Sequence, residues 1–159
     1  MENFVHVLKE CDNDFYRPLS STVMIQGTLE EKLEQVIKDK SLKNTEFVCI
    51  LTDFDDLIGY TMMNVNYDLP VKDYFIKSNY ISLTVISPHY RNNGYASKLY
   101  YFVEENYKNK GTKIITRRTW SLNHKQMYLN QKLGYQLIWT DLNHKDINVD
   151  SLYYMKKFE

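Results

Sequence analysis

A short polar turn from Pro88 to Ala96 holds the residues whose types and spacing are best suited to chemistry. It contains Arg91 and Gly94, it follows an alternating apolar segment, and it precedes apolar residues at helical spacing (Ala96, Leu99, Tyr100, Val103 and Tyr107). The first residues of a helix have unpaired backbone N–H groups at the positive end of the helix dipole. Combined with an arginine and a glycine, this arrangement favours binding of a phosphate group.

The spacing Arg91-x-x-Gly94-x-Ala96 differs from the common nucleotide-binding loops. It has no Lys-Ser/Thr pair, as a P-loop would, and it lacks the three spaced glycines of a dinucleotide fingerprint. Any phosphate held here therefore belongs to another class of ligand.

This turn resembles the acyl-CoA-binding motif of the GNAT superfamily of N-acyltransferases, which reads Arg/Gln-x-x-Gly-x-Gly/Ala after a strand that contains valine. The later segment from Asn123 to Tyr135 resembles the family's second motif, an Asn followed by a helix and Leu-Gly-Phe/Tyr. The two motifs have the order and spacing of the family, and the resemblance extends over essentially the whole chain.

The resemblance implies that acetyl-CoA is the co-substrate and that its diphosphate lies on the turn. The residues expected to contact it there are Arg91, Asn92, Asn93, Gly94, Tyr95, Ala96 and Ser97. It also implies that the strand before the turn splays from its neighbour, so that the backbones of Val85 and Ile86 pair with the pantetheine arm. The amide of Val85 or Ile86 is then the expected donor to the thioester oxygen.

One position departs from the commonest family pattern. Where many members have a tyrosine that acts as general acid, this chain has Asn130, as a related branch of the family does, together with Asn123 and Met127. Tyr128 lies about 200° away around a helix and is not expected to replace that acid. We expect Asn130 to contact the thiol or the pantetheine, and Asn123 to help bind it. The alternatives are a helix-surface polar residue and a simple helix cap.

The general base and the acyl acceptor stay open. The candidates for the base are Glu46, Asp53, Asp68, Asp73 and His89. In the family the acceptor is recognised by the segments that correspond to residues 12–27 and 67–79, and their composition does not choose between a small-molecule amine and a peptide. The alternatives to an N-acetyltransferase are a non-catalytic acyl-CoA-binding or sensing module and a modifier of charged tRNA.

Composition favours one soluble domain over residues 1–159. Hydrophobic residues make up 43% and charged residues 25%, and the formal net charge is zero, which argues against nucleic acid and membranes as partners. The histidines and cysteines show no metal-ligand spacing. Two unclustered cysteines and an N-terminus without a signal-peptide pattern favour the cytoplasm. We expect Cys49 to be buried, and Cys11 could be exposed.

The pattern predicts an α/β (α+β) fold with a mixed sheet of about seven strands flanked by about four helices, in the order β-α-α-β-β-β-α-β-α-β-β. The order agrees with the GNAT fold. Residues 4–8 are expected to form a first strand, residues 12–20 a short helix, and residues 68–79 a loop. Thr28 and Glu31 form a capping box. The last strand, Leu152 to Phe158, is aromatic on both faces and is the candidate interface of a possible homodimer, unless it is a buried edge strand.

Overall fold

The computed structural model describes all residues from 1 to 159. The helices are α1 (Glu2–Cys11), α2 (Leu29–Lys40), α3 (Tyr95–Asn109) and α4 (His124–Lys132), with short 3-10 helices η1 (Asp12–Asp14), η2 (Leu19–Thr22) and η3 (Pro88–Tyr90). The strands are β1 (Thr45–Leu51), β2 (Leu57–Val71), β3 (Tyr74–Ile86), β4 (Ile114–Trp120), β5 (Gln136–Asp146) and β6 (Val149–Lys157).

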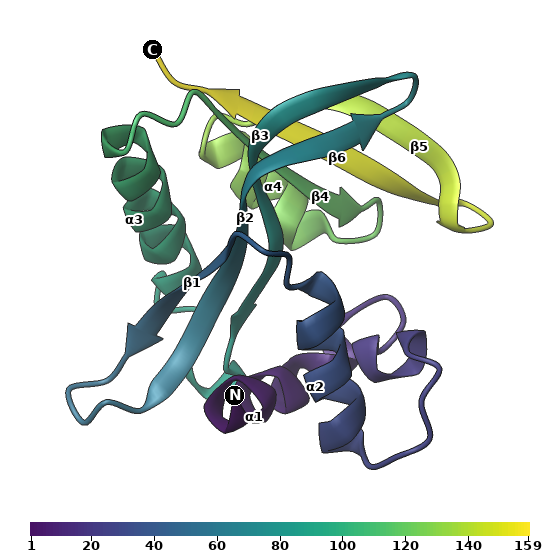
Figure 1. Cartoon of the computed structure of the whole chain (residues 1–159), viewed down its shortest axis with the longest axis vertical. Helices are drawn as coiled ribbons and strands as arrows, with labels where there is room; N and C mark the ends of the chain where they lie inside the picture. Colours follow the sequence, from purple (N-terminus) through teal and green to yellow (C-terminus); the bar gives the residue numbers. More distant parts are fainter. The chain divides into compact units, whose positions relative to one another are not determined.

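The six strands hydrogen-bond in the order β1-β2-β3-β4-β6-β5 (Figure 1). The β3–β4 pair is parallel, and β6 pairs antiparallel with both β4 and β5. The predicted α/β fold with a mixed sheet is therefore confirmed, with six strands in place of about seven.

Contacts between residues divide the chain into two compact units. Unit 1 comprises residues 1–63 and 83–103, and unit 2 comprises residues 64–82 and 104–159. The long strands β2 and β3 and the helix α3 contribute residues to both.

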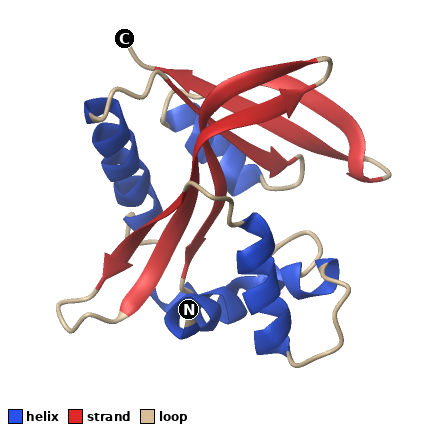
Figure 2. Ribbon diagram, viewed as in Figure 1, coloured by secondary structure: helices blue, strands red, loops and turns tan.

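In unit 1, helices α1 and α2 lie against each other and pack on β2 and on the end of β3 (Figures 1 and 2). Leu8, Leu33 and Tyr60 are among the buried residues of this core. The predicted capping box starts α2: the Thr28 hydroxyl accepts from the amide of Glu31, and the Glu31 carboxylate accepts from the amide of Thr28.

The prediction of a strand at residues 4–8 was wrong, because these residues belong to α1. Val5, Leu8 and Cys11 are spaced three apart and are all buried, which fits one face of a helix. A five-residue segment is too short to separate a period of two from a period of 3.6. Residues 12–20 contain two short 3-10 helices, where one short helix was predicted.

The prediction of a loop at residues 68–79 was also wrong. Strand β2 continues to Val71, the chain reverses at Lys72 and Asp73, and β3 begins at Tyr74. Lys72 has a φ of 53°, in the left-handed region that tight hairpin turns require. Leu69 and Val71 are buried and Pro70 is exposed, which is the alternation of a strand with one covered face.

Unit 2 is mostly strand, with α4 and the end of α3 as its helical parts (Figure 2). The Lys156 ammonium on β6 binds the Glu104 carboxylate on α3 at 2.5 Å and the Leu133 carbonyl after α4 at 2.7 Å. One lysine therefore joins the three elements. Because β6 pairs with a strand on each side, it is not an edge strand, and Leu152, Tyr153 and Tyr154 on it are buried. The prediction of β6 as an interface was wrong, and a homodimer stays a prediction.

Replacing Leu8 by alanine tests the helical assignment of the N-terminus. Leu8 is 0% exposed in the core of unit 1, whereas Leu42 is 48% exposed. We expect Leu8→Ala to lower the free energy of unfolding by about 2–5 kcal/mol through lost burial and the cavity left behind. Leu42→Ala removes the same atoms from the surface and should change it by about 0.5 kcal/mol or less. Urea unfolding measures both, and equal effects would contradict the placement of α1.

Candidate functional site

The turn between β3 and α3 has a backbone that few residue types allow. After η3, Arg91 is extended, Asn92 has a φ of 62°, and Gly94 has a φ of 76°. Helix α3 then begins at Tyr95. Asparagine and glycine are the residues that enter the left-handed region at least cost, so the local sequence matches the turn it forms. The Asn93 side chain helps to close the turn by donating to the Arg91 carbonyl at 3.0 Å.

The turn presents a run of free backbone donors. The first intrahelical bond runs from the amide of Lys98 to the carbonyl of Gly94 at 3.0 Å, and the amides from Asn93 to Ser97 form no hydrogen bond within the protein. A Cβ atom on Gly94 would meet no protein atom within 4 Å, so the space beside the turn is open. Unpaired amides at the positive end of a 15-residue helix form an arrangement suited to an anionic phosphate group.

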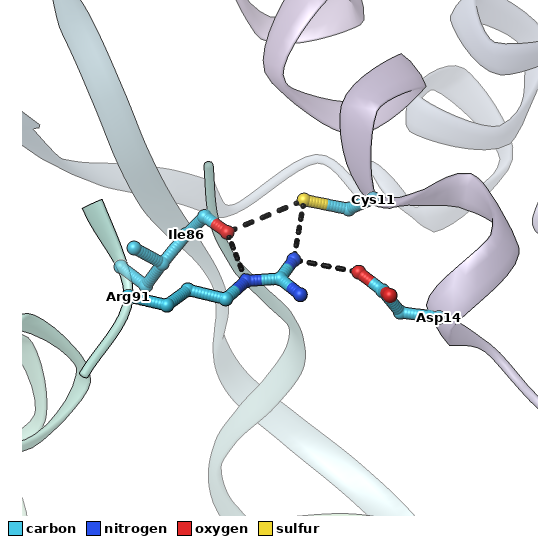
Figure 3. A network of polar contacts seen from close by, with 4 residues as sticks. All are labelled: Cys11, Asp14, Ile86 and Arg91. Atoms are coloured by element: carbon cyan, nitrogen blue, oxygen red, sulfur yellow. Dashed lines mark hydrogen bonds and ion pairs between the residues drawn. The ribbon is translucent and has the colours of Figure 1, made fainter. Parts of the chain in front are cut away.

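The Arg91 side chain turns back into unit 1 and anchors this turn (Figure 3). Its Nε donates to the Ile86 carbonyl at the end of β3 at 2.9 Å. Its Nη2 contacts the Asp14 carboxylate at 2.6 Å and the Cys11 sulfur at 3.2 Å. The thiol of Cys11 donates to the same Ile86 carbonyl at 3.4 Å. Arg91 thus connects the end of β3 with the last residue of α1 and with η1.

The two cysteines are placed opposite to expectation, with Cys11 buried and Cys49 exposed. Burial raises the pKa of the Cys11 thiol to about 11, although the Arg91 guanidinium acts in the opposite direction. Cys11 therefore remains a protonated thiol and serves as a hydrogen-bond donor to Ile86. Cys49 lies on β1, whose burial alternates only partly, so that strand is less covered than predicted.

The backbone at the end of β3 distinguishes Val85 from Ile86. The Ser87 amide donates to the Ile58 carbonyl on β2, and a Cβ on Gly59 would lie 2.9 Å from the Val85 carbonyl oxygen. Backbone groups of alternate strand residues point to the same neighbour, so those of Val85 are directed to β2 and those of Ile86 to the other edge. This orientation favours Ile86 over Val85 as a donor to a ligand along that edge.

The ladder between β3 and β4 is short. Its register runs from Asn79 opposite Ile115 to Ile81 opposite Arg117. Strand β3 continues to Ile86 and β4 continues to Trp120 beyond this ladder. Residues 83–86 of β3 lie outside this register, and the splaying of the strand stays a prediction.

Helix α4 in unit 2 carries the two asparagines of the second motif. Asn123 caps it, since its Oδ1 accepts from the Gln126 amide at 3.2 Å. Asn130 is 0% exposed, so it is not a helix-surface residue. Its Oδ1 accepts from the Gln126 side chain at 2.8 Å, while its buried Nδ2 has no hydrogen-bond partner. Tyr128 is 69% exposed and, as predicted, does not share the position of Asn130.

An unpaired buried donor is unusual. Leaving such a group unsatisfied costs about 1–3 kcal/mol, and most buried polar atoms in native proteins avoid that cost. Asn130 therefore has a donor available for a partner that the polypeptide does not supply.

The positions of the five candidate general bases give no reason to prefer one of them over the others. All five are exposed: Glu46, Asp53, Asp68, Asp73 and His89.

No group of three or more His, Cys, Asp or Glu side chains is arranged to hold a metal ion. No helix combines the length and apolar composition needed to cross a membrane.

Sequence reasoning did not find the roles of Cys11 and Asp14. Both bind Arg91 from positions 80 and 77 residues away in the chain. No local spacing reveals such a contact. The only available signal was the acidic sequence Asp12-Asn13-Asp14 directly after a cysteine.

The profile of the acetyltransferase (GNAT) family matches residues 8–135, so the chain belongs to this family. No match was found among curated protein sequences.

Solved structures show the same fold at low sequence identity. An N-acetyltransferase from Staphylococcus aureus Mu50 matches with a TM-score of 0.69 and 16% identity over 99% of this chain and 94% of that one. The ribosomal-protein-S18-alanine N-acetyltransferase of Escherichia coli matches with a TM-score of 0.67 and 10% identity, over 94% of this chain and 86% of that one. A GNAT family acetyltransferase from Elizabethkingia anophelis with acetyl-CoA bound matches with a TM-score of 0.63 and 18% identity, over 77% of this chain and 82% of that one.

The environments of the two cysteines predict different reactivity. We expect a disulfide-exchange reagent at about pH 8 to modify Cys49 in the native chain, because it is exposed, although partial burial raises the pKa of its thiol and slows the reaction. Cys11 should react only when the protein unfolds, because it is buried and its pKa is about 11. Thiol counting on the native chain and on Cys49→Ser checks this. Rapid modification of native Cys49→Ser would contradict the buried Cys11 thiol.

Proposed function

We propose that this chain is an acetyl-CoA-dependent N-acetyltransferase that transfers an acetyl group to the primary amine of a small molecule or a peptide. The observation that carries this proposal is the run of unpaired amides from Asn93 to Ser97, beside open space at Gly94. Membership of the GNAT family and the acetyl-CoA bound to the Elizabethkingia relative support it.

In this proposal the diphosphate of acetyl-CoA accepts hydrogen bonds from the turn. The neighbouring residues Arg91, Asn92 and Asn93 define the turn's shape. Because the Arg91 side chain is engaged with Asp14, Cys11 and Ile86, we assign it a positioning role. The helix dipole of α3 adds to the attraction for the phosphate charge.

The reaction is a direct attack of the amine nitrogen on the thioester carbonyl. A C–N bond forms, the C–S bond breaks, the CoA thiolate leaves, and a base takes the proton of the amine. A free thiol has a pKa near ~8.5, so a thiolate is a workable leaving group without a strong acid. The Ile86 amide is our candidate donor to the developing oxyanion, in preference to Val85.

Asn130 takes the place of a titrating acid in this scheme. An amide has no proton to give at neutral pH, but its Nδ2 can donate a hydrogen bond to sulfur or to a pantetheine carbonyl. The unpaired Nδ2 supports this role. Asn123 contributes by capping α4, the helix that carries Asn130.

Substitution of two glycines tests the diphosphate site with a matched control. Gly94 and Gly111 both have positive φ, at 76° and 86°, and a Cβ on either meets no protein atom within 4 Å. Glutamate at either position should cost about 1–2 kcal/mol of stability. Only Gly94→Glu adds a carboxylate beside the turn, so we expect its Kd for CoA to rise at least about tenfold. Calorimetric titration of both variants measures this, and an equal Kd would contradict the site.

The substitution Asn130→Leu tests the proposed role of the Asn130 side chain in acetyl transfer, with protein stability measured alongside. Leucine removes the unpaired donor at similar volume but also the acceptor of the Gln126 side chain, so we expect the free energy of unfolding to change by about 1–3 kcal/mol or less. We expect the acetylation rate on a panel of primary amines to fall at least about tenfold. Asn123→Ala is the control for a loss of helix capping, which costs about 1 kcal/mol. An unchanged rate in Asn130→Leu would contradict its role.

A wild-type chain that binds acetyl-CoA but acetylates no amine in the panel would instead favour the acyl-CoA-binding or sensing module. This alternative is based on Asn130, which stands where many members of the family have a tyrosine that acts as general acid.

A further inference from the structure

A second pocket lies wholly within unit 1 and is unlike the phosphate turn. It has a volume of about 380 Å³. Three segments surround it: one face of α1, the turn that leads into β2, and the residues after β3. The ionisable residues that line it are Glu10, Asp55, Asp56, Tyr90 and the two histidines His6 and His89, and Ser87 adds a hydroxyl group.

The pocket is acidic and has no basic partner for most of its charge. Glu10, Asp55 and Asp56 line it, and no lysine or arginine does. The only ion pair among the lining residues joins His6 and Glu10 at 3.7 Å. The Asp56 carboxylate receives only a long hydrogen bond of 3.5 Å from the Thr52 hydroxyl. Like charges would repel a phosphate, so this pocket does not suit the diphosphate of CoA.

Ser87 provides an independent indication of a ligand. It lines the pocket and is only 4% exposed, yet its hydroxyl forms no hydrogen bond within the protein. Its oxygen is not among the buried atoms that lack a partner, so it is accessible and can accept a hydrogen bond from a donor in the pocket. Tyr90 also lines the pocket, and aromatic residues are common partners of organic cations.

We propose that this pocket binds the ammonium group of an organic cation, with Glu10 and Asp56 neutralising its charge and the Ser87 hydroxyl accepting an N–H hydrogen bond. The acidic residues are not arranged as a metal site, which favours an organic cation over a metal ion. Binding here requires no acetyl-CoA, so the inference stands apart from the proposed acyl transfer.

Calorimetric titration with 1,4-diaminobutane tests the proposal, with 1,4-butanediol as the neutral probe of the same length. We use low ionic strength and about pH 8, where free imidazole is neutral. We expect the diamine to bind without acetyl-CoA and the diol not to bind. Binding should weaken at least about threefold in Glu10→Gln and in Asp56→Asn, and at least about tenfold in the double variant.

Asp53→Asn is the matched control, because Asp53 lies in the same turn and does not line the pocket. It should leave the Kd of the diamine unchanged, and thermal unfolding of each variant verifies its fold. Ser87→Ala should also weaken binding, because the ammonium loses an acceptor. The proposal is overturned if the wild type does not bind the diamine, if the diol binds equally well, or if Asp53→Asn weakens binding as much as Asp56→Asn.

Discussion

The anchoring of one guanidinium determines the geometry of the turn before α3. Arg91 donates to the last carbonyl of β3 and binds Cys11 at the end of α1 and Asp14 just beyond it, so the strand end, the turn and the first helix are positioned together. The turn can then keep its amides directed outward without side-chain caps. A helix start with this many unpaired donors needs such support, because no intrahelical bond holds its first residues. The order of the turn and the binding of an anionic ligand that we propose for it therefore depend on the same arginine.

Unit 2 shows a comparable arrangement around α4. The helix is held at its start by the Asn123 cap and at its end by Lys156, which binds the Leu133 carbonyl and the buried Glu104. Between these fixed ends, Asn130 is completely enclosed with one donor unpaired. A protein that tolerates this cost gains a preorganised donor, since no rearrangement of the helix is needed to present it. In the proposed acyl transfer, hydrogen bonds from backbone and amide groups take the place of the titrating acid.

Local signals in the sequence were sufficient for several elements. The Thr28 capping box and the glycines at positions 94, 111 and 134, all with positive φ, marked helix ends that the structure has. Two predictions that depended on a few residues were wrong. Residues 4–8 fit a strand and a helix equally well. The chain reversal at Lys72 lacks the glycine that usually marks such a turn. The network around Arg91 could not be predicted, because its partners lie far away in the chain and meet only through the packing of α1.

The central claim is that the turn amides hold the diphosphate of an acyl-CoA. Amide chemical shifts in a ¹⁵N-labelled chain, followed during titration with CoA, test it most directly. We expect the largest downfield shifts at the amides from Asn93 to Ser97, because a hydrogen bond to phosphate deshields the donor proton, and we expect small shifts at the equally exposed glycine turn of Gly111. Saturation with CoA that leaves the amides from Asn93 to Ser97 unshifted would contradict the account.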